Sequence, residues 1–421
     1  MVFDRILSAA MKNYYFWTII VWVLIVELYS VLPYRIPISE IDNLSQLLSK
    51  GFVNPEIAQG IIHVHSTFSD GGGAPDVIAK EAAKAGMDFV ILTDHNNYEA
   101  RKSGFEKQYG RTDLFVEMES ATPAGHVISF FSESAALKNS DYEAIIQSSY
   151  KQVVKKEFYP GLFVSIAHPT NIKNPWGRLD KLADGLEVIN FDSSWQRQAL
   201  ESPFQFLLTI LIYPFNQSLS AMRFYDPFLK DFTAWDEMTA RGPGHFAYLA
   251  HDTHSKIKID SERSLSWPGY FLTFKMASNV LFLKEPKALD FVTRKHQYYQ
   301  SLRAGRLAIV YHSLFPFQGN SWVTQCGDTP FISGDVVNAG ASCEMVIRTP
   351  ITPFSKIIRL IKNGEITNEV AIEGNATAPL KLPLSGNGTY RVEVLAKVHT
   401  ALRVTLNRLV PYVLYSPVYV Q

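Results

Sequence analysis

Short apolar runs alternate with helix-like stretches between about residues 58 and 312. Several runs end in polar or ionisable residues, as in "DFVILTDH" (88–95), "GLFVSIAHP" (161–169) and "FAYLAHDTH" (246–254). Just before the first of them, "APDVIAKEAAKAGM" (74–87) has the apolar spacing of an amphipathic helix. Strand–helix alternation of this kind predicts a parallel sheet in an α/β domain, and so many strands favour a closed barrel over an open sheet.

The pattern changes after about residue 317. Short β-rich runs such as "CEMVIRT" (343–349), "TYRVEVLAK" (389–397) and "PVYV" (417–420) are separated by Gly, Asn and Pro. This spacing predicts a C-terminal all-β, sandwich-like domain over residues 317–421. His399 is its one histidine, so we expect no chemistry there.

An apolar stretch, "NYYFWTIIVWVLIVELYSVLPY", occupies residues 13–34 and has Glu27 as its one charged residue. It approaches the roughly 20 residues that a membrane-spanning helix needs. Arg5 and Lys12 precede it, which favours a cytoplasmic N-terminus. We predict a transmembrane signal anchor at residues 1–35, with the rest of the chain in the periplasm or on the cell surface. The alternative is a buried N-terminal helix.

A second apolar run, "PFQFLLTILIYPF" (203–215), is too short to cross a bilayer. It lies within an expected insertion, residues 191–230, between two strands of the barrel. Two interpretations remain open, which are a helix packed on the barrel and a lid or membrane-dipping element close to the strand ends.

The composition argues against a nucleic-acid-binding function. The chain of 421 residues has 40 Lys+Arg and 40 Asp+Glu, so it has no net field that would attract nucleic acid. Cys326 and Cys343 are the two cysteines. They could form one disulfide in an oxidising compartment, or stay as two thiols.

Metal-capable side chains gather at the ends of the predicted strands. His63 and His65, in "GIIHVHSTFSDGG" (60–72), are two residues apart, and alternate side chains of a strand point to one face. Nine such residues are His63, His65, Asp70, His95, Glu117, His126, His168, Asp252 and His254. Carboxyl ends of barrel strands lie at one face, where nine such groups would be hard to desolvate without cations.

Imidazole and carboxylate without thiolate suit zinc, manganese or iron. The ligands are too many for one ion and fit two or three divalent ions. A carboxylate shared between two ions would hold them close together, and a water bridging them would become the hydroxide nucleophile of a hydrolase. Phosphate esters are its natural substrates, whether small or amphiphilic.

The motifs "HVHSTFSDGG", "ILTDHN", "VEMESATPAGH", "AHP" and "HDTHS" resemble, in order, those of the PHP (polymerase and histidinol phosphatase) superfamily. The resemblance covers residues 58–312 and implies a distorted (β/α)7 TIM-like barrel with three metal ions. The C-terminal tail is similar to that of the CehA/McbA-like branch.

The resemblance also implies which residues hold each ion. His63, His65, Glu117 and Asp252 would hold the first, and Glu117 would bridge to a second held by His126 and His168. Asp70, His95 and His254 would hold the third. Glu117, Asp252 and His254 are the expected catalytic residues. The roles of Asp94 and His251 are open, as groups that orient ligands or as packing residues, whereas His245 and His312 are expected to be structural or exposed.

These features favour a membrane-anchored, extracytoplasmic metal-dependent phosphoesterase. One alternative is a hydrolase of carbamates, amides or other non-phosphate esters. Another is a non-catalytic, metal-binding surface protein. A DNA exonuclease fits poorly with the balanced charge and the expected anchor.

Overall fold

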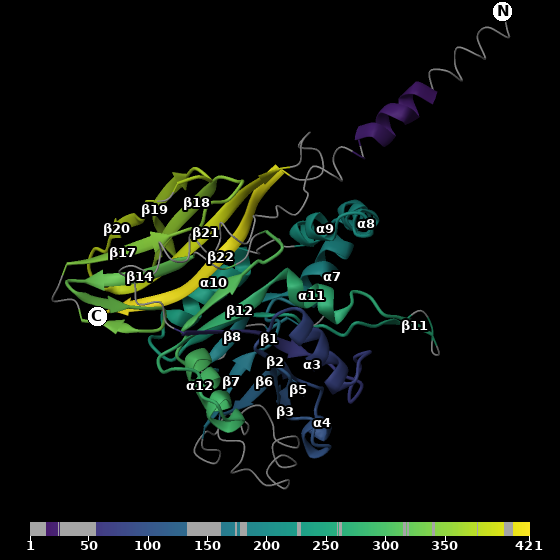
Figure 1. Ribbon diagram of the computed structural model, residues 1–421, viewed down its shortest axis with the longest axis horizontal. Coiled ribbons are helices and arrows are strands. Elements are labelled where there is room, and N and C mark those ends of the chain that lie inside the picture. Colours follow the sequence, from purple (N-terminus) through teal and green to yellow (C-terminus); the bar gives the residue numbers. More distant parts are fainter. Residues whose placement is uncertain are drawn as a thin grey trace, which may run out of the picture.

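The fold is seen in a computed structural model of the chain (Figure 1). It describes residues 14–23, 25, 56–132, 161–172, 175–176, 183–224, 229–258, 260, 263–314, 317, 320–338, 342–376, 378–399 and 407–421.

Residues 58–312, the expected catalytic region, begin with parallel strands, as the sequence predicts. β1 (Glu56–Val64), β2 (Phe89–Leu92) and β4 (Thr112–Val116) run side by side in the same direction. α3 (Pro75–Lys84) connects the first two strands and begins with a proline, which is well suited to the first turn of a helix. Its apolar side chains Ile78, Ala79 and Ala82 are fully buried and belong to one cluster with those of the three strands.

A second sheet continues from the first. Its strands, in order, are β5 (Met118–Thr122), β6 (Gly125–Phe131), β7 (Leu162–Ile166), β8 (Gly185–Asn190) and β9 (Phe246–Ala250). β7, β8 and β9 are parallel, but β6 is antiparallel to both of its neighbours. The tight β5–β6 connection therefore replaces a strand–helix–strand crossover, and the sheet is mixed.

Both edges of the second sheet meet the first. On one side, β4 passes into β5 through a single residue, Glu117. On the other, the backbone N–H groups of His251 and Asp252 donate to the carbonyls of Ile62 and His63 at 3.0 and 2.7 Å. Apolar side chains of both sheets share one buried cluster. The carboxyl ends of β1 and β9 are thereby held together.

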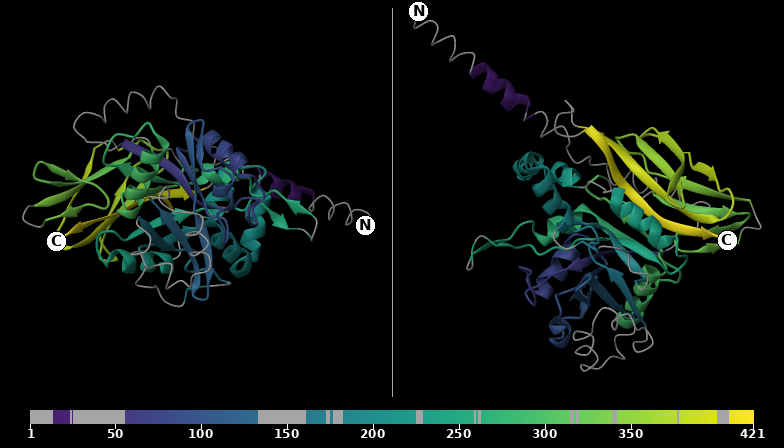
Figure 2. Two further views of the ribbon diagram at one scale, coloured as in Figure 1. Left: turned by 90° about the horizontal axis from the view of Figure 1, so that it is seen from below. Right: turned by 180° about the vertical axis from the view of Figure 1, so that it is seen from behind.

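The C-terminal strands extend the first sheet. β12 (Ser278–Leu283) pairs with β1, β13 (Leu307–Val310) pairs with β12, and β22 (Asn407–Val420) pairs with β13. β21 (Gly388–His399), β18 (Lys356–Lys362) and β19 (Glu365–Ile372) complete that side. The two further views show these strands beside the catalytic region (Figure 2). The C-terminal β region is thus joined to the rest by a continuous sheet.

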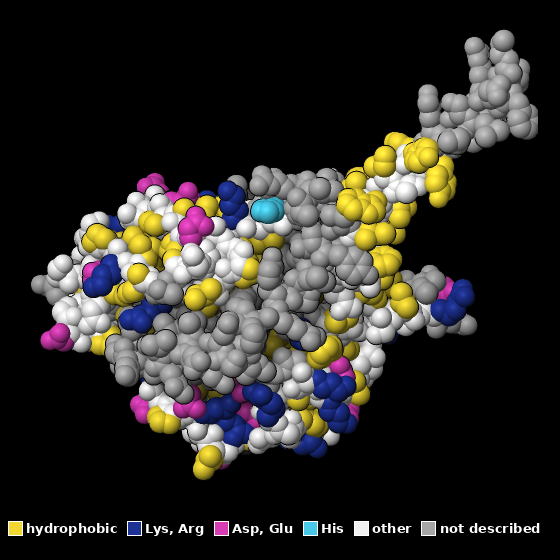
Figure 3. Space-filling view, turned by 45° about the horizontal axis from the view of Figure 1, so that its top comes forward, with side chains coloured by type: hydrophobic (Ala, Val, Ile, Leu, Met, Phe, Trp, Pro, Cys, Tyr) yellow, Lys and Arg dark blue, Asp and Glu magenta, His cyan; other side chains and the backbone are white. Residues whose placement is uncertain are grey.

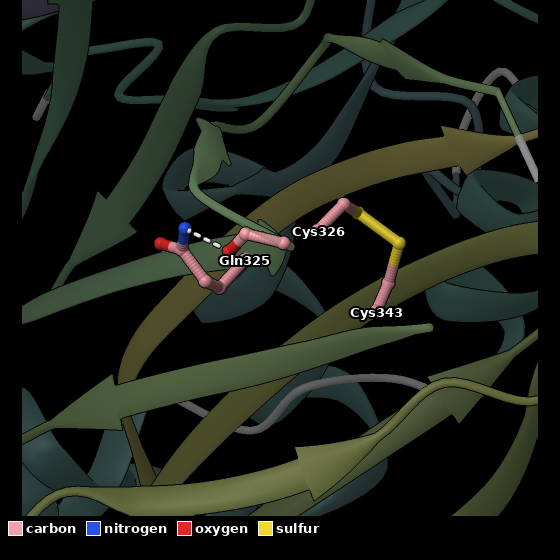
Figure 4. The surroundings of a disulfide bond; sticks show 4 residues. Gln325, Cys326 and Cys343 are labelled. Carbon is pink, nitrogen blue, oxygen red and sulfur yellow. Dashed lines mark hydrogen bonds between the residues drawn. A yellow bond between two sulfur atoms is a disulfide. The ribbon is translucent and has the colours of Figure 1, made fainter. Parts of the chain in front are cut away.

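A four-stranded sheet packs against this extension. It contains β15 (Thr329–Phe331), β14 (Ser321–Cys326), β17 (Cys343–Arg348) and β20 (Leu380–Pro383). Apolar side chains from both sheets form one buried cluster, as in a β-sandwich. Cys326 and Cys343 lie opposite each other on β14 and β17 and form a disulfide (Figure 4). Of the two states left open by the sequence, the structure has the bonded one.

The insertion between β8 and β9 is helical. It comprises α7 (Phe191–Glu201), α8 (Pro203–Ile212), α9 (Gln217–Phe224) and α10 (Leu229–Thr239). In α8, Thr209 and Ile212 are buried, whereas Phe204, Leu207 and Leu211 are 75%, 54% and 59% exposed. The apolar run therefore packs along one side and presents apolar side chains to solvent along the other.

Shorter elements complete the chain. They are α4 (Glu99–Lys102), β3 (Lys107–Tyr109), β10 (Ile257–Lys258), β11 (Ser264–Leu265), α11 (Tyr270–Met276), α12 (Phe291–Arg303) and β16 (Val336–Val337).

Most of the expected anchor, residues 1–35, lies outside the described residues. Residues 14–23 are helical, and most of their apolar side chains are exposed in a segment that stands apart from the body of the protein (Figure 3). Within the part of the chain that the structure describes, no helix combines the length and apolarity needed to cross a membrane.

Leu414 tests whether the C-terminal strands share a core with the catalytic region. It lies on β22 opposite Ile309, is fully buried and belongs to the cluster shared by the two catalytic sheets. Leu414→Ala should lower the free energy of unfolding by about 2–5 kcal/mol, because it leaves a cavity. Denaturation followed by both circular dichroism and tryptophan fluorescence should show this as one transition. The matched control Ile366→Ala, at a side chain 54% exposed, should change little; two separate transitions, with only one shifted, would show independent cores.

Candidate metal centre

Strand ends from both sheets bring one set of imidazoles and carboxylates together. His63 and His65 come from the end of β1, His95 follows β2, His126 lies on β6 and His168 follows β7. Eight of the nine residues predicted from the sequence lie in this cluster, joined by one that the sequence analysis missed, Glu119. The eight are His63, His65, Asp70, His95, His126, His168, Asp252 and His254.

The buried carboxylate of Glu119, on β5, is at the middle of the cluster. One oxygen, Oε1, lies 2.8 Å from His126 Nδ1 and 2.9 Å from His168 Nε2. The other, Oε2, lies 3.1 Å from His63 Nε2, 3.2 Å from His65 Nε2 and 3.1 Å from His95 Nδ1. A carboxylate has about four lone-pair sites, so five ring nitrogens exceed what its hydrogen bonds can satisfy.

Asp252 closes the cluster opposite Glu119. Its Oδ1 lies 3.3 Å from His63 Nε2 and 3.2 Å from His65 Nε2, and these two nitrogens are 3.0 Å apart. Ligand atoms that each lie about 2.1 Å from one ion are separated by about 3 Å, so the spacing fits one coordination sphere.

Among the residues that the structure describes, three overlapping groups offer ligand atoms that lie within 4.8 Å of one another. They are His63–His65–Glu119, His95–Glu119–His126 and His65–Asp70–His95–His254. Glu119 belongs to two of them, which is the position of a bridging carboxylate. The donor set is therefore suited to more than one divalent ion.

The backbone at these positions is unusual. His63, His168 and Asp252 have φ values of 69°, 31° and 49°, in the left-handed region that residues with a β-carbon seldom occupy. The register between β1 and β2 shifts at His63, between Ile62 and Val64. The strand is therefore irregular at His63, and simple strand alternation does not by itself account for its position beside His65. Strain of this kind is common at functional sites.

Hydrogen bonds and a glycine fix the conformation of the loop after β1, which carries Asp70. Asp94 accepts hydrogen bonds from the Ser66 backbone N–H at 2.8 Å and from the hydroxyls of Ser66 and Ser69, both at 2.6 Å. A β-carbon at Gly71 would lie 2.2 Å from the carbonyl oxygen of His65, so the turn requires glycine. Of the two roles left open for Asp94, the structure supports one that positions the loop carrying Asp70.

Charge compensation raises the pKa values of several buried histidines in the cluster. Burial alone would lower the pKa values of His63, His65 and His168, but neighbouring carboxylates raise all three, to about 10 for His65 and about 9 for His168. Burial would raise the pKa of Glu119, but the imidazoles around it hold it well below its usual value. Protonated histidines here supply positive charge that bound cations would replace, with release of protons.

A second layer of residues orients the ligands. Glu187, on β8, lies 2.5 Å from His63 Nδ1, which leaves Nε2 directed at the cluster, and it accepts from the His168 backbone N–H at 2.7 Å. The Asn190 amide donates to Glu187 at 2.8 Å and to Asp252 at 3.1 Å. Such partners fix the ring orientation of metal-binding histidines. The sequence analysis missed Glu187, although a glutamate within the apolar run "GLEVIN" was a usable signal.

The structure corrects the prediction that Glu117 bridges two metal ions. Its carboxylate accepts from the Tyr299 hydroxyl at 2.8 Å and pairs with Lys295 at 2.9 Å, both on α12. It therefore belongs to a buried ion pair in the core and does not contact the metal-binding cluster in the structure. The central position inferred for Glu117 is occupied by Glu119, two residues along.

The histidines outside the cluster include His245, His251 and His312. His251 is buried between Phe191 and Phe274, its Nε2 lies 3.0 Å from the Ala277 carbonyl, and burial lowers its pKa to about 3. His245 and His312 contact Gly242 O at 3.1 Å and Ser278 Oγ at 2.7 Å, respectively. All three are in packing or hydrogen-bonding positions.

Part of the chain matches a known protein family. Residues 62–138 match the family model of the PHP domain. That segment contains His63, His65, Asp70, His95, Glu119 and His126. Comparison with curated proteins finds no match for this chain.

Solved structures give distant likenesses. A two-domain protein from Bacteroides vulgatus, containing a predicted PHP-like metal-dependent phosphoesterase, has 15% identity and a TM-score of 0.41, over 85% of this chain and 96% of its own. An amidohydrolase from Chromobacterium violaceum, with bound sulfate and no metal, has 14% identity and a TM-score of 0.29, over 47% of this chain and 88% of its own. Likenesses at this level carry no argument about activity.

Two glutamates form a matched test of the centre. Glu119→Gln should lower the bound metal by at least one ion per chain, because an amide cannot neutralise the cations and imidazoles around it. Glu117→Gln should retain the metal but lower the free energy of unfolding by about 3 kcal/mol, because it leaves Lys295 without that buried charge partner. Elemental analysis and urea denaturation of both purified variants measure these effects. Full metal content in Glu119→Gln, or metal loss in a folded Glu117→Gln, would contradict the assignment.

Proposed function

We propose that the chain is a metal-dependent hydrolase of the PHP type that acts on phosphate esters. The observation that carries this proposal is the Glu119 carboxylate with five imidazole nitrogens within 3.2 Å. The PHP-domain match supports the same class of enzyme. The two joined sheets are compatible with the distorted (β/α)7 barrel that the resemblance implies.

Two or three divalent ions, of zinc, manganese or iron, would be held by these residues. His63, His65, Glu119 and Asp252 form one group of ligands, His126 and His168 extend it through Glu119, and Asp70, His95 and His254 form another. When bound, such ions activate water and stabilise the oxyanions of a phosphoryl transition state.

The chain's own residues prepare the site for this chemistry. Glu187 holds the His63 ring. His254 Nδ1 lies 3.0 Å from the Asp252 carbonyl oxygen, which directs the Nε2 of His254 toward Asp70. The His254 and Asp70 side chains are 23% and 45% exposed, whereas Glu119 is 1% exposed. Substrate therefore has access from the His254 and Asp70 side, and Asp252 and His254 remain the proposed catalytic residues, with Glu119 in place of Glu117.

Metal dependence and substrate class are tested together. Purified full-length protein should contain two or three transition-metal ions per chain, because the ligand groups exceed the capacity of one. Chelation should abolish at least nine-tenths of the hydrolysis of a phosphomonoester, and added zinc, manganese or iron should restore it. The panel should also contain a phosphodiester, a carbamate and an amide. A metal content reproducibly below one ion per chain would contradict the metal centre, and turnover of the carbamate or amide alone would reassign the reaction.

We also propose that the enzyme is tethered to a membrane and works outside the cytoplasm. The apolar stretch 13–34 supports a tether, the positive charges before it support the orientation, and the Cys326–Cys343 disulfide suits an oxidising compartment. The exposed apolar side of α8 would then face the bilayer.

Fusion reporters test the orientation. An alkaline phosphatase fused after Gln421 should be active, because this reporter needs an oxidising compartment to form its disulfides. A fusion that lacks residues 1–35 serves as the control and should be inactive. Activity of the control, or inactivity of the full-length fusion despite normal expression, would overturn the proposed location.

A further inference from the structure

A cleft leads away from the metal centre along the helical insertion. At the end nearer the metal ligands it is lined by polar groups that include Asp192, Asp252 and His254. It adjoins a second pocket that reaches Tyr213, Ser220 and Met276. The two share one wall, made of Phe191, Trp195, Trp267, Pro268 and Thr273.

Aromatic rings dominate the far pocket. Tyr213 and Trp267 meet edge to face, with ring centroids 5.4 Å apart and planes at 72°. The ring of Trp195 stacks on Phe206 at 6.2 Å, and its indole N–H donates to Asp192 Oδ1 at 2.9 Å. The polar end of Trp195 is thus engaged by Asp192, so that this side chain offers mainly apolar surface to the pocket.

The hydroxyl groups of this pocket are largely used within the protein. The Ser220 hydroxyl donates to the Thr209 carbonyl at 2.9 Å, and the Thr273 hydroxyl donates to the Gly269 carbonyl at 3.1 Å. The Tyr213 hydroxyl is buried and has no hydrogen-bond partner among the residues that the structure describes. The pocket therefore suits an apolar group.

The cleft thus has a charged, metal-binding end and an aromatic end. We propose that the aromatic pocket binds the apolar alcohol portion of the substrate, which makes the substrate an amphiphilic phosphoester with an alkyl or aryl group. This inference rests on the proposed phosphoesterase function. It adds a specificity site formed by Trp195, Tyr213, Trp267 and Met276.

Chain length provides the direct test. The metal-loaded, full-length protein should hydrolyse methyl, butyl and octyl phosphate with specificity constants that rise roughly fourfold for each methylene group that enters the pocket. Calorimetry with non-hydrolysable methylphosphonate and octylphosphonate should show the same preference in binding. Equal rates and equal binding across the series would overturn the pocket while leaving the phosphoesterase function intact. Absence of hydrolysis with every phosphoester would instead contradict the proposed function itself.

Two separate variants test the pocket, so that the test still holds if one of them does not fold. Trp195→Ala and Met276→Ser should each lower the ratio of octyl to methyl specificity constants by about tenfold, because each removes apolar surface. Phe204→Ala, on the exposed side of α8 and outside the pocket, is the matched control and should leave the ratio unchanged. An unchanged ratio in both folded pocket variants would contradict the assignment.

A dissolved alkyl phosphate and a bilayer phospholipid share this chemistry, and a second arm distinguishes them. Phosphatidic acid in phosphatidylcholine vesicles should be hydrolysed if the source is a bilayer. The triple variant Phe204→Ser, Leu207→Ser, Leu211→Ser should then lose most of this activity and keep that on octyl phosphate. Hydrolysis of octyl phosphate but not of vesicle phosphatidic acid by the wild type would assign the pocket to dissolved esters, and equal activities of the variant and the wild type on vesicles would show that the exposed side of α8 does not contact the bilayer.

Discussion

A buried carboxylate surrounded by imidazoles is the constraint on which the catalytic region depends. Glu119 is 1% exposed and close to five ring nitrogens, an arrangement that cannot be satisfied by hydrogen bonds alone. Divalent cations satisfy it because each supplies positive charge to several ligands at once. The fold brings these ligands together because strand ends from two sheets meet at one point.

The two sheets meet there through few contacts. Backbone hydrogen bonds between β9 and β1 fix Asp252 against His63, and Glu187 and Asn190 connect β8 to the same residues. The left-handed backbone at His63, His168 and Asp252 is tolerated where such contacts hold it in place. The ligands are therefore positioned by the packed strands rather than by the metal alone.

Much of this site could be predicted from the sequence, because ligands follow apolar runs and strand ends converge. The choice between Glu117 and Glu119 could not. They are two residues apart, and what separates them is the pairing of Glu117 with Lys295 and Tyr299, more than 170 residues away in the chain. Likewise, the sequence does not reveal that β13 pairs with β22, because this pairing joins segments distant in sequence. Local patterns do not encode which edges meet.

The central claim, that Glu119 shares metal ions with the surrounding histidines, is tested most directly by anomalous diffraction from crystals of the metal-loaded protein. We expect at least two anomalous peaks at the absorption edge of the bound metal. Both should lie within about 2.5 Å of Glu119 oxygens, with His63, His65, His126 or His168 nitrogens as further ligands. Peaks next to Glu117, or no peak within coordination distance of Glu119, would contradict the account.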